Sequence, residues 1–251
     1  MKGSFRTRAL VLKTTDYSET SQVIRVFARD HGILDLLAKG SRRPASKSSS
    51  FHAPFDLGGW YDLNFKQRSG DLHLATEARL VEGFGHLRDD LATWLDATLS
   101  LDILRNLLTP GDPNNELLRE TLQYFKLLSA RRGRRRLRNR FFQTVLAASG
   151  VMPSWNHCSD CESPLAEFSV NGVSLELPAG LLCGNCRTSR GRFLIDNELL
   201  TYLRADSGRD WGLVPSWEVP QPVVLRGWEI LSSLLWHHLE RPPRSLRYLR
   251  V

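Results

Sequence analysis

The sequence predicts an α+β protein in which a small β-barrel precedes an all-α region with an inserted four-cysteine module. Three observations lead to this fold class. Short apolar runs separated by turn residues fill the first 82 residues, apolar residues recur at helical spacing after Phe84, and two close cysteine pairs follow further on. We therefore expect a barrel domain over residues 1–82 and a helical domain over 83–251, with the cysteine module at 152–192.

Five N-terminal segments have the composition of β-strands. They are rich in Val, Ile and Leu, and turn residues such as His31-Gly32 and Ser69-Gly70-Asp71 separate them. Five strands in about eighty residues favour a small closed barrel. The predicted strands are 8–15, 21–28, 33–38, 59–66 and 72–80.

Helical periodicity replaces the strand pattern after Phe84. Apolar residues recur three and four positions apart, and Pro110-Gly111, Gly150 and Pro153 interrupt the pattern. The predicted helices are 87–108, 115–128, 134–148, 196–204 and 223–239.

Composition narrows the class of protein. A chain of 251 residues with 41% hydrophobic residues can fill sizeable cores, and no apolar run is long enough to cross a bilayer. We expect a cytoplasmic protein with no membrane partner, in a compartment where thiols stay reduced. The formal charge of +7 favours polyanionic partners, although many basic proteins use charge only for solubility.

The four cysteines form the most specific motif. Cys158 and Cys161 are separated by two residues, as are Cys183 and Cys186, and 21 residues lie between the pairs. This spacing predicts one structural zinc ion, because four thiolates complete a closed tetrahedral shell and leave no position for an activated water. Free thiol pairs, a redox pair and an iron–sulfur cluster remain as alternatives.

A basic loop follows the third predicted strand. Lys39, Arg42, Arg43 and Lys47 lie in a Ser-rich segment that resembles a phosphate-binding loop but lacks the glycine directly before its lysine. We expect these four side chains to contact nucleic-acid phosphates without reading sequence. A solvated surface loop is the alternative.

Seven arginines fall within residues 131–140. On a helix that begins near Arg134, the side chains of Leu137, Phe141 and Val145 share one face, while Arg134, Arg135 and Arg138 can point outward. Arginine binds carboxylates and phosphates through two hydrogen bonds, so this segment is a candidate anion surface. A solvated helix entry would look the same in sequence.

Other residues give weaker signals. Trp60, Tyr61 and Phe65 can be base-stacking platforms or core aromatics, and His237-His238 lacks a partner ligand one turn away, so a metal site there is not expected. No nucleophile–base or hydrolytic metal motif is present, so we expect a binding protein and no catalytic centre.

Taken together, these motifs resemble the bacterial recombination mediator family RecO over nearly the whole chain. The resemblance is densest in the first eighty or so residues. Its segments are Ala9 to Lys13, Asp16 to Ser21, His31-Gly32, Leu37 to Gly40, Arg42 to Pro44, Pro54 to Gly58, Ser69 to His73, the four cysteines and Pro243 to Arg250.

The resemblance implies an oligonucleotide-binding (OB) barrel followed by a helical domain that carries the zinc module. It also implies binding of single- and double-stranded DNA, annealing of complementary strands, contacts with RecR and with SSB, and help in loading RecA onto SSB-coated strands. In that family the SSB partner ends in an acidic tail whose last residue is apolar. From their charge alone, Arg132, Arg135 and Arg138 are the candidate contacts for this tail. The alternatives are a zinc-ribbon transcription or RNA-binding factor and a metal-dependent nuclease.

Overall fold

The computed structural model describes residues 3–44, 50–128, 133–165, 172–188, 193–239, 243 and 245. The chain divides into two compact units, one made of residues 1–126 with 243–250 and the other of residues 127–242 with 251. The first helix after the barrel and most of the second therefore belong to the same compact unit as the barrel. The predicted boundary between residues 82 and 83 separates folding domains, which are not the same as these compact units, so that boundary stays a prediction.

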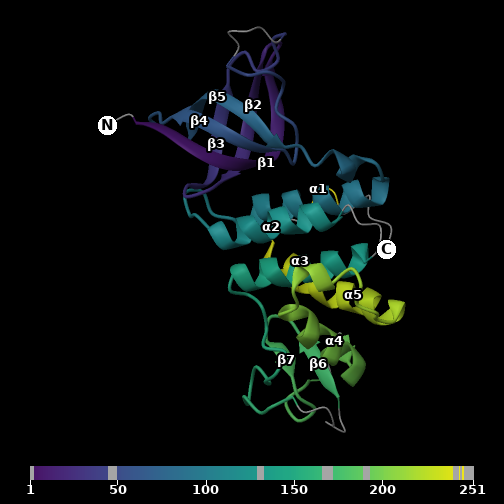
Figure 1. Cartoon of the computed structure of the whole chain (residues 1–251). Coiled ribbons are helices and arrows are strands. Elements are labelled where there is room, and N and C mark those ends of the chain that lie inside the picture. Colours follow the sequence, from purple (N-terminus) through teal and green to yellow (C-terminus); the bar gives the residue numbers. More distant parts are fainter. Residues whose placement is uncertain are drawn as a thin grey trace. The chain divides into compact units, whose positions relative to one another are not determined.

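A closed five-stranded barrel forms the larger part of the first unit, as predicted (Figure 1). Its strands are β1 (Ser4–Ser18), β2 (Ser21–Ala28), β3 (Gly32–Ala38), β4 (Trp60–Lys66) and β5 (Leu72–Glu82). Their order is β1-β2-β3-β5-β4, and β3 and β5 form the parallel pair of the barrel. The first half of β1 pairs with β4 and its second half with β2, so this one long strand closes the barrel and gives an OB topology.

Alternating side chains fill the barrel. In β1, Ala9 and Val11 point into the barrel. Leu10 and Leu12 alternate with them and are not part of the interior, but they are also buried. Both faces are therefore covered, which explains why the sequence reads as apolar runs. The interior is made of Ala9, Val11, Ile24, Val26, Ala28, Leu36, Ala38, Phe51, Phe55, Tyr61, Leu63, Phe65, Ala75 and Ala78.

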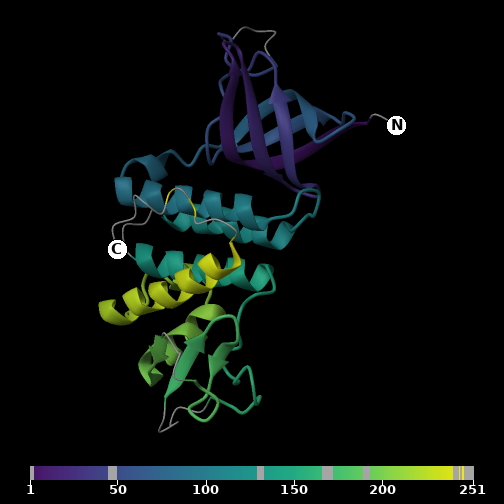
Figure 2. The same ribbon diagram turned by 180° about the vertical axis from the view of Figure 1, so that it is seen from behind.

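Two helices follow the barrel in the first unit, and they run side by side in Figures 1 and 2. The predicted helix 87–108 is in fact a short 3-10 helix, η1 (Gly85–Arg88), followed by α1 (Leu91–Leu107). The break has a local cause, because the Asp90 carboxylate accepts a hydrogen bond from the Thr93 N–H at 2.9 Å and so caps a new helix. The next helix, α2 (Asn115–Leu128), has the predicted bounds.

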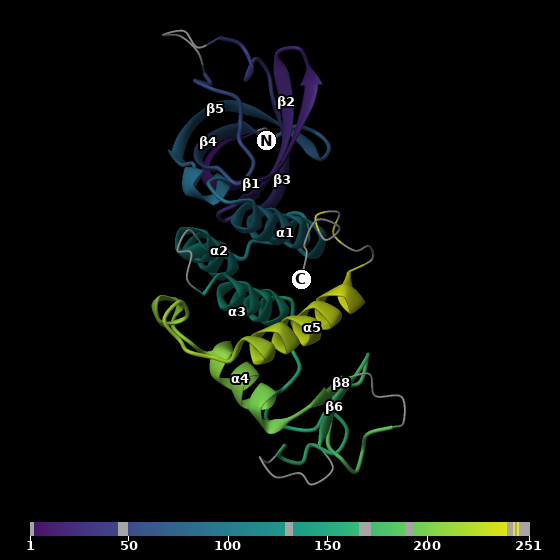
Figure 3. The same cartoon turned by 90° about the vertical axis from the view of Figure 1, so that its right-hand side faces the viewer.

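The second unit combines three helices with a small sheet (Figure 3). Helix α3 packs against α5, and α4 contacts both. No strand was predicted in or beside the cysteine module, but the unit contains a three-stranded antiparallel sheet of order β7-β6-β8. The elements are α3 (Arg134–Ala148), β6 (Val173–Glu176), β7 (Gly180–Leu182), β8 (Phe193–Ile195), α4 (Asn197–Ser207), the 3-10 helix η2 (Trp211–Leu213) and α5 (Gln221–His238).

In the part of the chain that the structure describes, no helix is both long enough and apolar enough to span a bilayer.

Candidate metal centre and nucleic-acid surfaces

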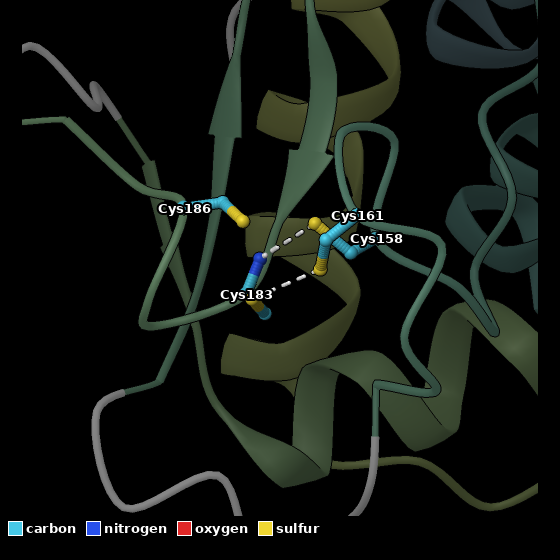
Figure 4. A group of neighbouring side chains, drawn as sticks. All are labelled: Cys158, Cys161, Cys183 and Cys186. Carbon is cyan, nitrogen blue, oxygen red and sulfur yellow. Dashed lines mark hydrogen bonds between the residues drawn. The ribbon is translucent and has the colours of Figure 1, made fainter.

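The four cysteines that the spacing singled out lie together (Figure 4). Their sulfur atoms are all within 4.8 Å of one another, and the Sγ atoms of Cys161 and Cys183 are 3.8 Å apart. A tetrahedral site with metal–sulfur bonds of about 2.3 Å has sulfur–sulfur edges of about 3.8 Å. The group can therefore hold one metal ion with little rearrangement.

Each cysteine pair lies on a tight turn. In the second pair, the N–H groups of Cys186 and Arg187 donate to the Cys183 carbonyl, at 3.1 and 2.9 Å. The N–H of Cys183 also donates to the Cys158 sulfur at 3.4 Å, which ties the two turns together (Figure 4). Cys183 directly follows β7, so the sheet that the sequence did not reveal brings the second pair to the first.

The titration of the thiols fits a cation in their midst. Hydrogen bonding by Ser163 lowers the pKa of Cys161 to about 6, whereas the hydrogen bond with the Cys161 sulfur raises the pKa of Cys186 above its ordinary value. One thiolate is stabilised, and a second negative charge beside it is disfavoured. A divalent cation removes this conflict, because it binds cysteine as thiolate.

The cysteine module is anchored to the helices of its unit through one arginine. Arg204 of α4 donates from Nε to the Trp155 carbonyl at 2.9 Å and from its guanidinium to the Leu165 carbonyl. The Trp155 indole N–H donates to the Gln143 side chain of α3 at 3.0 Å. Chain segments on both sides of Cys158 and Cys161 are therefore fixed to the helices of the same unit.

The basic loop after β3 is held in place by hydrogen bonds. The Ser41 hydroxyl is buried and donates to Gln22 at 3.0 Å, and the Arg42 N–H donates to the Thr20 carbonyl at 3.1 Å. The Arg42 guanidinium also pairs with the Asp16 carboxylate at 3.0 Å. These contacts fix the loop against the turn between β1 and β2.

Of the four predicted phosphate contacts, three lie in the described residues. Lys39, Arg42 and Arg43 are exposed on this loop, while Lys47 lies outside the described residues. Exposure and anchoring fit a surface that meets a polyanion, and the contacts themselves stay predictions.

The arginine segment is used differently from the expectation. The predicted inward face of α3 is confirmed, since Leu137, Phe141 and Val145 are buried. The expectation that Arg138 points outward is wrong: only 4% of this residue is exposed, and its guanidinium carbon lies 3.6 Å from the centre of the Trp228 ring of α5. Its role in an SSB contact is untested and stays a prediction.

Neighbouring arginines of α3 also take part in the fold. Arg136 donates to the Val214 and Pro215 carbonyls, and Arg140 donates to the Arg209 carbonyl. Arg135 is partly exposed, and Arg132 lies outside the described residues.

Comparison with known proteins agrees with this architecture. The family model described as recombination protein O, N terminal, matches residues 1–84, and the model for its C terminal matches residues 88–247. The chain belongs to the recombination protein O family.

Family relatives extend over nearly the whole chain. The DNA repair protein RecO of Anaeromyxobacter dehalogenans (strain 2CP-C) is 29% identical over 245 residues, which cover 96% of this chain and 93% of that protein. The DNA repair protein RecO of Streptomyces griseus is 28% identical over 259 residues, which cover 98% of each. That of Moorella thermoacetica is 26% identical, with 99% of this chain and 91% of that protein covered.

The sequence left two roles open for three aromatic residues of the barrel, base stacking or core packing. Trp60, Tyr61 and Phe65 are all buried, and Tyr61 and Phe65 lie in the barrel interior. The core prediction is therefore confirmed, and the stacking hypothesis is wrong. Among the described residues, the four cysteines are the group of metal-ligating side chains close enough to share an ion, and neither His237 nor His238 belongs to such a group.

Two features of the site were not found from sequence. Asp16 was noted only as part of a resemblance, and nothing in the spacing told us that its carboxylate orients Arg42, 26 positions later. Likewise, Ser41 and Gln22 looked like ordinary polar residues, but their buried hydrogen bond anchors the basic loop. Both are contacts between distant segments, for which a single sequence offers no signal.

Proposed function

We propose that this chain is a recombination mediator in bacterial DNA repair. In this role it binds single- and double-stranded DNA, anneals complementary strands and, with RecR, helps load RecA onto SSB-coated single strands. It works by binding in the cytoplasm and at the nucleoid, and uses no catalytic centre. Family membership supports the DNA repair and recombination role.

One observation carries the DNA-binding part of this proposal, namely a basic loop that is fixed to one end of a closed barrel. The hydrogen bonds of Ser41 and Arg42 hold the described part of this loop, residues 39–44, so that it loses little conformational entropy on binding and its charges are effective phosphate ligands. Lys39, Arg42, Arg43 and Lys47 are the proposed contacts. The Asp16 carboxylate pairs with one nitrogen of the Arg42 guanidinium. Because arginine has five N–H donors, other N–H groups of Arg42 remain for a phosphate.

The decisive experiment measures annealing of two complementary strands, each coated with SSB. The proposal expects the purified protein to accelerate annealing strongly over SSB-coated strands alone. A protein that leaves the rate unchanged on both naked and coated strands would contradict the proposal. Cleavage of either strand in the presence of magnesium would instead favour a nuclease.

The loop contacts are tested by salt dependence. Replacing Arg42 and Arg43 by alanine removes up to two phosphate contacts, so the slope of log affinity against log salt should become shallower by roughly 1.4 on single strands. Arg6 and Arg8 are matched controls, because both are exposed arginines of the same barrel that pair with Asp62. If both double variants behave alike, the loop is no special DNA contact.

We propose that Cys158, Cys161, Cys183 and Cys186 bind one structural Zn²⁺. All four ligands are sulfur, and a shell of four thiolates holds the metal for folding and leaves no open position for chemistry. Elemental analysis of protein purified without chelator should find one zinc per chain, and Cys158→Ser should lose it. Iron in place of zinc, or no metal at all, would overturn this assignment.

The SSB tail is the proposed ligand of the arginine-rich start of α3. A hollow of about 300 Å³ lies there, and it combines basic and apolar side chains as an acidic tail with an apolar end requires. Because Arg138 is buried under Trp228, the accessible part of the proposed set shifts toward Arg135 and its neighbours. The hollow is lined by Gly133, Arg134, Arg135, Arg136, Val219, Gln221 and Val224.

A labelled peptide with the sequence of the SSB tail tests this site. Arg135→Glu should weaken peptide binding about tenfold, since it replaces an attractive charge with a repulsive one. Arg119→Glu is the matched control, because Arg119 is an exposed helical arginine in the other compact unit. Equal affinity of both variants would move the tail site away from α3.

A further inference from the structure

Tyr17 stands out on the barrel because its side chain is left in water. It is 66% exposed at the end of β1, beside the turn that leads into β2. Aromatic side chains carry a large apolar area, and single-strand-binding proteins use such rings as stacking surfaces for bases.

Local backbone geometry explains why this ring is not packed. Asp16 pairs with Gln22 and Ser18 pairs with Ser21, so the register shifts between Asp16 and Ser18 and Tyr17 is the extra residue of a β-bulge. A bulged residue has no cross-strand partner, and bulges redirect side chains near functional sites. The Tyr17 ring therefore has no side chain opposite it on β2 to pack against.

The basic loop lies against the same turn. Asp16, directly before Tyr17, holds the Arg42 guanidinium at 3.0 Å, and the Arg42 N–H binds the Thr20 carbonyl on the other side of the turn. Lys39 and Arg43 are exposed on that loop. Cations for phosphates and an exposed ring are thus placed at one end of the barrel by the same set of contacts.

No other described Phe, Tyr or Trp of the five strands offers a comparable surface. Trp60, Tyr61 and Phe65 are buried. Phe5, which is 37% exposed, already stacks on Phe65 with ring centres 5.4 Å apart. Tyr17 alone in this set combines high exposure with a fixed basic neighbour.

We propose that Tyr17 stacks on an unpaired nucleobase, so that this end of the barrel prefers single-stranded DNA to duplex DNA. The inference rests on the proposed DNA-binding function and adds the residue that distinguishes the two forms. Phosphates are present in both forms, but the face of a base is accessible only where the strand is unstacked and unpaired.

Fluorescence anisotropy with a labelled thymidine oligonucleotide and with a duplex of equal length tests the proposal. Tyr17→Ala should weaken single-strand binding about tenfold, which is the loss expected for one base–aromatic stack, and change duplex binding less than twofold. Tyr17→Phe and Tyr17→Trp should keep the affinity of the unmodified protein, because both retain an aromatic face. The slope of log affinity against log salt should stay unchanged in Tyr17→Ala, since no phosphate contact is lost.

Two controls exclude a general effect of the substitution. Leu80→Ala removes another exposed apolar side chain of the barrel, 49% exposed on β5, and should leave single-strand affinity unchanged. The second control is a strand with abasic positions. The unmodified protein should bind this strand about tenfold more weakly than the thymidine strand. Tyr17→Ala should then cause no further loss on the abasic strand.

The outcomes separate this inference from the function on which it rests. If the unmodified protein binds neither DNA form, the DNA-binding function fails and the stacking role fails with it. If the protein binds both forms but Tyr17→Ala affects neither, or weakens both equally, only the stacking role is overturned. Equal binding of the abasic and thymidine strands by the unmodified protein also overturns it.

Discussion

The side chains of the arginine-rich segment differ in what they contact. Arg138 is buried against the Trp228 ring, and Arg136 donates to backbone carbonyls of residues 214 and 215. A guanidinium is planar and weakly hydrated, so it can pack on an aromatic face while its edge makes hydrogen bonds. Arg138 is therefore part of the core of the second unit, and Arg136 is partly exposed but also makes contacts within that unit.

Asp206 is a buried acid in the same core. Its carboxylate accepts a hydrogen bond from Gln143 at 2.8 Å, and the neighbouring cations are Arg140 and Arg209. Burial raises the pKa of Asp206 to about 7, although the hydrogen bond and the two arginines act in the opposite direction. The folded state therefore holds this proton to a higher pH than the unfolded state does.

The pH dependence of stability follows from this shift. In the unfolded chain the acid titrates near its ordinary pKa of about 4, so the contribution of Asp206 to stability is full below pH 4 and is lost as the pH rises through 7. Asp206→Asn removes the charge and should stabilise the protein at pH 8, by up to roughly 4 kcal/mol. Thermal unfolding from pH 4 to 8 should show this gain shrinking toward acid pH.

Asp196, at the other end of α4, is the matched control. Partial burial raises the pKa of Asp196, but the Leu199 N–H and the Arg226 guanidinium outweigh it and hold the pKa below its ordinary value. Asp196→Asn should therefore destabilise the protein at neutral pH, and the loss should diminish as the pH falls. The same pH trend for both variants would contradict the account of Asp206.

At the level of elements, the turn between β2 and β3 docks on the segment that leads into α2. Asn115, the first residue of α2, donates from its side chain to the Asp30 carboxylate at 2.6 Å and accepts from the Asp30 N–H. Gly32, with φ +67°, lies so close to Asp112 that a Cβ atom would come within 2.4 Å of its carbonyl oxygen. This contact fixes the position of the α2 start on the barrel.

Gly32→Ala should destabilise the first unit by about 3 kcal/mol. A side chain at this position costs free energy both from the left-handed backbone and from the overlap with the Asp112 backbone. Gly70→Ala is a suitable control, because Gly70 also has a positive φ but nothing lies within 4 Å of its Cβ position. Denaturant unfolding should show a clearly larger loss for Gly32→Ala; equal losses would mean that the close approach is relieved at no cost.

For the whole molecule, the proposed metal site and the proposed DNA surface belong to different compact units. The cysteine module has strands of only three or four residues, which bury too little apolar surface to fold without a further constraint. The metal is therefore expected to support the second unit, while the loop after β3 depends on contacts within the barrel.

Removing the metal should separate these roles. Treatment with a strong chelator should expose residues 152–192 to limited proteolysis, because metal binding contributes on the order of 10 kcal/mol to such modules. Single-strand affinity should fall less than threefold, and readdition of zinc should restore protection. Loss of DNA binding in parallel with the metal would show instead that the two units are coupled.

The sequence alone was sufficient for the five barrel strands, most helices, the core face of α3 and the group of four cysteines that can hold a metal ion. These features follow from periods of 2.0 and 3.6 residues and from the fixed spacing of the cysteine pairs, so neighbouring residues carry the information. Tertiary contacts decided the burial of Arg138, the salt bridge between Asp16 and Arg42, and the exposure of Tyr17 beside it. Each of these depends on segments far apart in the chain, and a single sequence does not encode which distant partner a polar or aromatic side chain meets.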